Sequence, residues 1–200
     1  MKITLKLDVL SVMRLLQESP VEFLEPLSKP PESIYVTEVK GPYGSIVIGG
    51  SDKGVMLARL CVSIGQFSRD IHEEWGTHSI IDDVPLKRTI EVLKAYFEGA
   101  PGSIEATVQP LMTTPFILKV HQYLTRIPYG QTLTYGDIAA SIGNPRASRA
   151  VGGACGRNRV LIIVPCHRVV ARKCIGGFGR GNFVAGLKLK RSLIEHEGIK

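Results

Sequence analysis

A cysteine and a histidine stand side by side in the stretch Val164-Pro165-Cys166-His167-Arg168. A thiol is a weak nucleophile and its thiolate a good one, so a reactive cysteine needs a base within hydrogen-bond reach. Neighbours along a strand point to opposite faces, and a contact between these two residues therefore needs a backbone turn, which the proline permits. The pattern indicates a nucleophile beside its base. The alternative is a buried structural thiol next to a surface histidine.

A general base needs an acid that orients it, and residues 116–200 offer few. The acidic residues of this range are Asp137, Glu195 and Glu197. Asp137 fits a capping box with Thr134, a hydroxyl cap followed three residues later by a carboxylate. The two glutamates lie near the end of a predicted C-terminal helix. From the residues alone, either glutamate could orient His167.

Charge divides the chain into an acidic part and a basic part. Residues 1–115 hold 11 Lys and Arg against 15 Asp and Glu, whereas residues 116–200 hold 14 against 3, within a net charge of +7. A basic region of this kind is the electrostatic footprint of a nucleic-acid-binding protein. A basic surface without such a partner is the simpler alternative.

Composition excludes several other classes of protein. With 200 residues, of which 44% are hydrophobic, the chain can form one or two domains with a real core. Its four cysteines form no C-x-x-C pair, which speaks against a zinc site and a disulfide scaffold. Charged residues interrupt the N-terminal stretch, so we expect no signal peptide and no membrane span. We therefore predict a soluble, cytoplasmic protein of prokaryotic type without metal or cofactor.

The first half of the chain has the signals of an α+β fold. Residues 44–49 and 55–62 read as two strands joined by a glycine-rich turn, which predicts a hairpin. An apolar stripe after Pro85 predicts a helix that Gly99 ends. The breaker cluster at 99–103 marks a boundary. We predict an N-terminal α/β domain over residues 1–110 and a mostly helical C-terminal domain over 111–200.

The second half carries three closely spaced helix signals. We predict helices over residues 116–127, after the Thr134 cap, and from Pro145 to about Ala154 with Asn144 as its cap. The last two, joined by a tight turn, are typical of a helix-turn-helix. Downstream, the apolar run 161–164 predicts a buried strand, and a final helix is expected over 186–197.

The third of these helices is built from small residues. Gly152 and Gly153 each cost about 1 kcal/mol relative to alanine inside a helix. DNA lying against the helix, with Arg149 reaching into the duplex, would explain the small side chains. Tight packing between helices is the alternative.

Taken together, these motifs resemble one family. The run Pro165–Val169, preceded by Asn158, by the segment 148–154 and by Tyr135, is similar to the O6-alkylguanine-DNA alkyltransferases, also called methylated-DNA–protein-cysteine methyltransferases. Matching features extend over about residues 116–198. The resemblance implies a ribonuclease H-like N-terminal domain and a winged-helix-like C-terminal domain.

The resemblance also implies a role for each catalytic residue. Cys166 would accept the alkyl group from O6 of guanine as a thioether that cannot revert, so each molecule acts once. His167 would deprotonate it through a water, and Glu197, in the family's His-Glu-Gly ending, would orient His167. Asn158 would brace the loop. Tyr135 would stabilise the leaving guanine as negative charge develops.

The implied partner is double-stranded DNA carrying O6-alkylguanine, with O4-methylthymine as a second candidate substrate. The target base would be flipped out, Arg149 would enter the stack, and the helix would press into the minor groove. The implied DNA-binding residues are Arg146, Ser148, Arg149, Ala150 and Gly152. The implied pocket residues are Val169, Phe183 and Val184, with Phe178 as the alternative to Phe183. We expect a monomer, and we expect Cys155 and Cys174 not to react with alkylated DNA.

The chain also departs from the family pattern. Arg159 and Leu161 stand where prolines are usual, and Ile117 and His121 stand where Gln and Trp are usual. The loop after the cysteine motif is longer. The alternatives are a lesion-binding relative that transfers nothing, a helix-turn-helix regulator and a thiol hydrolase. Cys166 argues against the first, because such proteins replace that cysteine.

Overall fold

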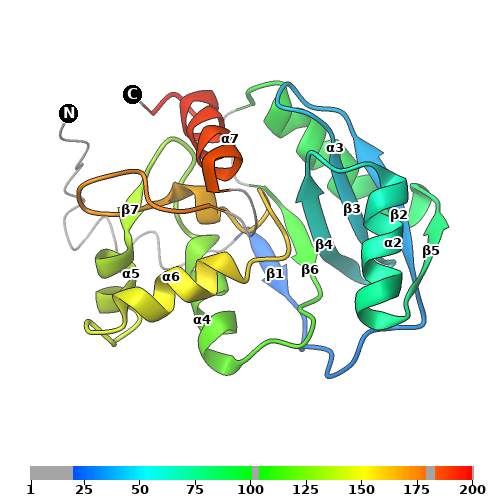
Figure 1. Ribbon diagram of the computed structural model, residues 1–200, viewed down its shortest axis with the longest axis horizontal. Helices are drawn as coiled ribbons and strands as arrows, with labels where there is room; N and C mark the ends of the chain where they lie inside the picture. The colour runs from blue at the N-terminus through cyan, green and yellow to red at the C-terminus, as the bar shows by residue number, and fades with distance from the viewer. Residues whose placement is uncertain (1–19, 101–103, 179–182, 200) are drawn as a thin grey trace.

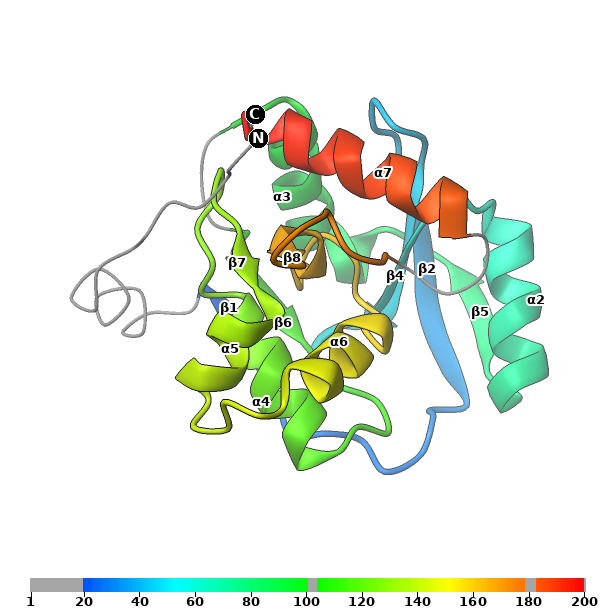
Figure 2. The same cartoon turned by 60° about the vertical axis from the view of Figure 1, so that its left-hand side comes forward.

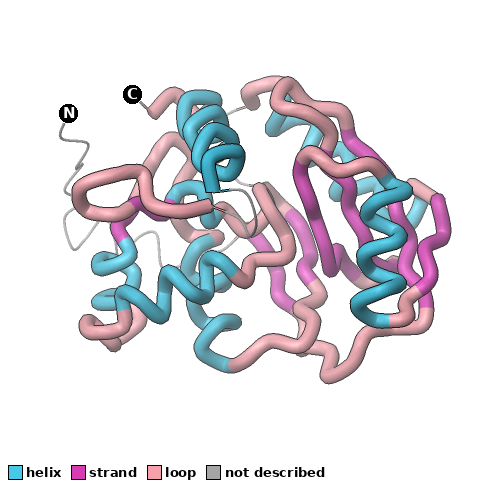
Figure 3. Tube along the Cα trace, in the orientation of Figure 1, coloured by secondary structure: helices cyan, strands magenta, loops and turns pink. Residues whose placement is uncertain are grey.

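The computed structural model describes residues 20–100, 104–178 and 183–199. It is a mixed α/β structure in which one sheet is flanked by helices (Figure 1). The strands of this sheet gather in one part of the molecule and the helices of the second half in the other (Figure 3).

The sheet has six strands in the order β1-β6-β4-β3-β2-β5. They are β1 (Val21–Phe23), β2 (Ser33–Val39), β3 (Ile46–Ser51), β4 (Gly54–Leu60), β5 (His78–Ile81) and β6 (Ala106–Val108). β2, β3 and β4 form an antiparallel meander, while β1, β5 and β6 pair in parallel at its sides. The predicted hairpin is confirmed as β3 and β4.

Side chains of the sheet alternate between two hydrophobic clusters, as the period of a strand requires. Val47 of β3 packs in one cluster with Phe67 and Ile71 of α2 (Ile64–Trp75). Ile46 and Ile48 pack in the other, with α3 (Lys87–Phe97) and the helices of the second half. A 3₁₀ turn, η1 (Val84–Leu86), leads into α3.

The helices of the second half are α4 (Pro115–Leu124), α5 (Tyr135–Ser141), α6 (Ser148–Gly156) and α7 (Phe183–His196). α4 and α5 both pack against α6, and α7 crosses above them (Figure 2). The predicted capping box is confirmed, because Thr134 Oγ1 accepts from Asp137 N at 3.2 Å and Asp137 accepts from Thr134 N at 2.9 Å. A 3₁₀ turn, η2 (Cys166–Arg168), leads into β8 (Val169–Val170), which pairs with β7 (Leu133–Thr134).

The predicted strand over residues 161–164 is wrong. These residues form a tight turn in which Val164 N donates to Val160 O at 2.9 Å and Ile162 has a φ of 72°. Ile162, Ile163 and Val164 are buried. The apolar run therefore indicates that this turn is buried and does not indicate a strand. A short apolar run alone does not determine the backbone conformation.

Three predicted helix boundaries also need correction. α6 begins at Ser148 and not at Pro145, because Asn144 O accepts from Ala147 N at 2.9 Å in a turn that precedes the helix. α4 ends at Leu124, before the predicted Ile127, and α7 begins at Phe183, before the predicted Gly186. Boundaries depend on local capping bonds that the apolar pattern does not encode.

Hydrophobic contacts cross the predicted domain boundary, because one core cluster joins residues of the sheet to residues of α4, α5 and α6. The division at residue 110 stays a prediction.

Among the residues that the structure describes, no helix is long and apolar enough to cross a bilayer. In the same part of the chain, no group of three His, Cys, Asp and Glu side chains could hold a metal ion.

Candidate active site

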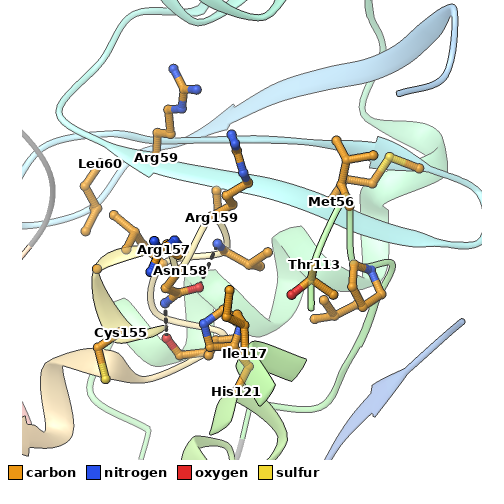
Figure 4. A pocket seen from close by; sticks show the side chains of 18 of the residues that line it. Met56, Arg59, Leu60, Thr113, Ile117, His121, Cys155, Arg157, Asn158 and Arg159 are labelled. Carbon is orange, nitrogen blue, oxygen red and sulfur yellow. Dashed lines mark hydrogen bonds between the residues drawn. The ribbon is translucent and has the colours of Figure 1, made fainter. Parts of the chain in front are cut away.

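Cys166 is the first residue of η2 and its side chain is nearly buried, with 5% of the residue exposed. Asn158 holds it, because Asn158 Nδ2 donates to Cys166 Sγ at 3.1 Å and to Val164 O at 2.7 Å. The Oδ1 atom of Asn158 accepts from Val160 N at 2.9 Å, which fixes the orientation of the amide (Figure 4). Asn158 therefore links the turn at 160–164 to the sulfur.

Burial raises the pKa of the Cys166 thiol, while the hydrogen bond from Asn158 and the charge of Lys190 lower it. Lys190 is completely buried, and its Nζ donates to Val169 O and, at 3.1 Å, to Gly177 O. Burial lowers the pKa of Lys190 to about 8. Two groups thus favour the thiolate in a site that otherwise disfavours charge.

His167 and Glu197 form a buried pair beside the cysteine. His167 Nε2 lies 2.7 Å from Glu197 Oε1, and both side chains are fully buried. Burial lowers the pKa of His167, while Glu197 acts in the opposite direction. A neutral ring that donates from Nε2 has its lone pair on Nδ1, and among the described residues this buried atom has no hydrogen-bond partner. The free nitrogen is the atom that could accept a proton.

Glu197 is held as a carboxylate by several donors. Arg168 Nε donates to Oε2 at 2.9 Å, and Gly130 N donates to the same oxygen at 3.2 Å. Tyr96 Oη donates to Oε1 at 3.0 Å. Burial alone would raise the pKa of Glu197, but the contacts with His167 and Arg168 lower it to about 2. The acid that orients His167 is therefore ionised at neutral pH.

Tyr135, the first residue of α5, lies between α6 and the loop that follows the cysteine motif. A Cβ added at Gly152 would lie 3.7 Å from Tyr135 Cε1, and one added at Gly176 would lie 2.9 Å from Tyr135 Oη. Burial raises the pKa of Tyr135 to about 12, with nearby cysteines adding to the shift. The hydroxyl stays protonated at neutral pH and can donate.

The residues expected to contact DNA lie on or next to one helix. Arg146, Arg149 and Ala150 are exposed, and Ser148 and Gly152 are partly exposed. The opposite side of α6 carries Val151 and Ala154, which are buried. The structure thus presents a face with small side chains and two arginines.

Comparisons with known proteins identify relatives of this chain. A family model described as the DNA-binding domain of 6-O-methylguanine DNA methyltransferase matches residues 115–199. A methylated-DNA–protein-cysteine methyltransferase of Saccharolobus islandicus is 38% identical over 161 residues, covering 80% of this chain and 93% of the relative. The protein of the same name from Methanosarcina acetivorans is 36% identical over 166 residues, covering 82% and 99%.

The chain belongs to the methylated-DNA–protein-cysteine methyltransferase family. A crystal structure of the Mycobacterium tuberculosis O6-methylguanine methyltransferase matches the fold with a TM-score of 0.67 at 32% identity, covering 82% of this chain and 92% of that one. Mycobacterium tuberculosis OGT in complex with DNA gives the same TM-score.

Two departures from the methyltransferase pattern have visible consequences. His121, at a position where the family usually has a larger side chain, makes a 3.0 Å hydrogen bond between Nε2 and Ala154 O and so holds α4 to α6. Leu161, at a usual proline position, donates its N–H to Ala58 O at 3.1 Å. Proline has no N–H and could not make that bond.

The pocket residues of this methyltransferase are described only in part. Val169 is completely buried and Phe178 is nearly so. The side chains of Phe183 and Val184 lie outside the described residues, so the preference for Phe183 over Phe178 stays a prediction.

A cleft of about 780 Å³ lies between β4 and the helices, and Asn158, Cys155 and Phe178 are among its lining residues (Figure 4).

Sequence reasoning missed three residues of the site. The sequence assigned no role in the site to Arg168, which stands in the cysteine motif, to Tyr96, which belongs to the apolar stripe after Pro85, or to Lys190. A charged residue inside an otherwise apolar segment was the available signal for Arg168, because an unpaired charge is rarely buried. No pattern pointed to Tyr96, whose partner Glu197 lies 101 residues away.

Proposed function

We propose that this chain repairs DNA by moving an alkyl group from O6 of guanine to Cys166 in a single, irreversible step. The observation that carries the proposal is the network in which Asn158 binds the sulfur and Glu197 orients a neutral His167. Membership of the methylated-DNA–protein-cysteine methyltransferase family supports the same conclusion. O4-methylthymine is a second candidate substrate.

The residues divide the reaction between them. The thiol proton of Cys166 passes through a water to Nδ1 of His167, and Glu197 stabilises the imidazolium that forms. The sulfur then forms a bond to the alkyl carbon as the bond from that carbon to O6 breaks, and the electron pair stays on guanine. The Tyr135 hydroxyl stabilises the negative charge that develops there. The thioether product holds no thiolate, so the chain acts once.

The burial of Cys166 determines how DNA is bound. Because the sulfur is nearly inaccessible, a base within a duplex cannot reach it, and the target nucleotide must be flipped out. In this proposal α5 and α6 act as a helix-turn-helix, with α6 in the minor groove and Arg149 in the stack. The helix-turn-helix belongs to a winged-helix-like domain over residues 111–200, and residues 1–110 form a ribonuclease H-like domain. The protein acts as a monomer.

The test is mass analysis after incubation with a duplex that contains O6-methylguanine. We expect the intact protein to gain one methylene, 14 Da by mass balance, on the peptide that contains Cys166. Cys166→Ala should gain nothing, and Cys155→Ala is the matched control that should gain the same mass as the wild type. Tight lesion binding without a mass change would instead support the recognition-only alternative. Modification of Cys155 or Cys174 would overturn the assignment of the nucleophile.

A further inference from the structure

Tyr96 reaches the catalytic pair from the other half of the molecule. It lies in the last turn of α3, is almost completely buried, and donates from Oη to Glu197 Oε1 at 3.0 Å. His167 Nε2 lies 2.7 Å from that same oxygen. The tyrosine and the histidine therefore share one acceptor atom.

We propose that Tyr96 is a positioning residue of the transfer reaction, which shares Oε1 of Glu197 with His167 and so limits how strongly the carboxylate attracts a proton onto the imidazole. The proposal rests on the proposed function, in which neutral His167 accepts the thiol proton. A hydrogen bond to a carboxylate stabilises its charge and makes it a weaker partner for a second donor. Tyr96 would thus keep His167 available as a base.

The hydroxyl of Tyr96 is a hydrogen-bond donor. Burial raises its pKa far above the ordinary value, and the neighbouring negative charge of Glu197 raises it further. The phenol therefore keeps its proton at neutral pH and can donate to the ionised Glu197 carboxylate.

The position of Tyr96 is fixed independently of Glu197. His196 Nε2 donates to Tyr96 O at 2.7 Å, which ties the end of α3 to α7. The Tyr96 ring also packs edge-on against Phe97 and Tyr129, with ring centroids 5.7 and 6.1 Å apart. Removing only the hydroxyl should leave these contacts in place, which makes phenylalanine a suitable replacement.

Other charged and titratable groups also face the pair, and the test must separate them from Tyr96. Arg168 contacts Glu197 directly, Lys190 affects His167 through its charge, and Cys166 precedes His167 in η2. Tyr129 lies nearby, but its hydroxyl donates to His196 O at 3.0 Å and not to the carboxylate. Tyr129→Phe therefore removes a hydroxyl from the same cluster without removing a donor to Glu197.

The experiment compares the wild type, Tyr96→Phe and Tyr129→Phe by NMR titration of the His167 ring and by single-turnover transfer from an O6-methylguanine duplex over a range of pH. In Tyr96→Phe we expect the His167 titration midpoint to move upward by roughly half a pH unit or more, because Glu197 would hold the imidazolium more strongly. The acidic limb of the rate profile should move with it, slowing transfer below the midpoint by about threefold or more. The rate at higher pH should be unchanged.

In Tyr129→Phe we expect the titration midpoint of His167 and the acidic limb of the pH–rate profile to be the same as in the wild type. Thermal unfolding of each variant reports any general loss of structure. A uniform loss of rate in Tyr96→Phe without a shift would assign Tyr96 a structural role only and overturn the proposal. An equal shift in Tyr129→Phe would do the same. Absence of transfer by the wild type would refute the proposed function, and the NMR midpoints would then still test the contact with Tyr96.

Discussion

At the scale of single residues, the site is organised around one buried carboxylate. Glu197 accepts from His167, Arg168, Tyr96 and the backbone of Gly130. A buried charge is tolerated only when it is paired and hydrogen-bonded, and here an arginine supplies the countercharge. The arrangement gives His167 a fixed orientation, and its second nitrogen has no hydrogen-bond partner among the described residues.

This carboxylate makes stability depend on pH in a defined direction. The pKa of Glu197 is lowered from 4.5 in the unfolded chain to about 2 in the folded protein. The ionised carboxylate therefore contributes fully to the free energy of unfolding at pH values above 4.5, and this contribution is lost as pH falls toward 2. The difference in pKa corresponds to about 3 kcal/mol. We expect Glu197→Gln to cost about that much at pH 6 and about 1 kcal/mol at pH 3, measured by urea unfolding.

Glu195→Gln is the matched control, because Glu195 is exposed in the last turn of α7, two residues before Glu197. It should change the free energy of unfolding little at either pH. An unchanged difference between wild type and Glu197→Gln at the two pH values would contradict the ionised state assigned to Glu197.

Asn158 is expected to control the reactivity of the sulfur. In Asn158→Ala the hydrogen bond that lowers the pKa of Cys166 is lost, so the pH dependence of thiol alkylation should move to higher pH. Hydrogen bonds to charged groups contribute about 1.5–3 kcal/mol, and we expect single-turnover transfer to slow by roughly tenfold or more. Affinity for the lesion duplex should stay the same. An alkylation profile identical to that of the wild type would refute this role.

How much of the site can be predicted from sequence differs between residues. Cys166 and His167 follow from the chemistry of adjacent residues, while the residues alone left Glu195 and Glu197 open. The family ending favoured Glu197, and the 2.7 Å contact with His167 places it at the pair. Tyr96 could not be predicted, because its contact with Glu197 depends on how α3 packs against α7.

At the scale of elements, the capping box at Thr134 was predicted correctly, whereas the apolar run 161–164 and the Asn144-Pro145 helix signal were not. The Thr134 capping box appears where it was predicted, since each of its bonds is local. The apolar run 161–164 folds as a turn, because Leu161 N donates to Ala58 O of β4 and Val164 N donates to Val160 O. Asn144 and Pro145 resemble a helix start, but the turn they form delays α6 to Ser148.

The exposed face of α6 makes a prediction about base flipping. Arg149→Ala should slow transfer from duplex DNA by roughly 10- to 100-fold, because extruding a base costs a few kcal/mol that the arginine would offset. Transfer from the free base O6-methylguanine should change less than about twofold, since no stack is opened. Single-turnover rates on the two substrates test this. Arg88→Ala, an exposed arginine of α3 paired with Glu105, is the control and should affect neither rate.

At the scale of the whole molecule, the first half of the chain supports the site in two places. Tyr96 contacts Glu197, and β4 holds the Asn158 loop through Ala58, which donates to Arg159 O at 2.8 Å. The Arg159 side chain adds an ion pair with Glu74 at 3.0 Å and lies over the Trp75 ring at 4.8 Å. We infer that the N-terminal part acts as a scaffold for the catalytic loop.

Arg159→Ala tests the second of these supports. The ion pair is partly exposed and contributes little by itself, but with the Trp75 contact we expect a loss of about 1 kcal/mol. That loss corresponds to a fall in Tm of about 2–4 °C for a chain of this size, measured by calorimetry. Arg157→Ala is the control, because Arg157 is exposed and bonds only to Gly153 O of its own helix among the contacts described. An equal fall in Tm in both variants would contradict a specific stabilising role for the contacts of Arg159 with Glu74 and Trp75.

The central claim is that one chain accepts one alkyl group, and the most direct measurement is stoichiometric. The protein is incubated with an excess of duplex that carries O6-methylguanine with an isotopically labelled methyl, and the label bound to protein is counted over time. We predict a plateau at one methyl per chain, with an equal amount of guanine restored. Continued loss of methyl from DNA beyond that plateau, or binding of the lesion with no label transferred, would contradict the account.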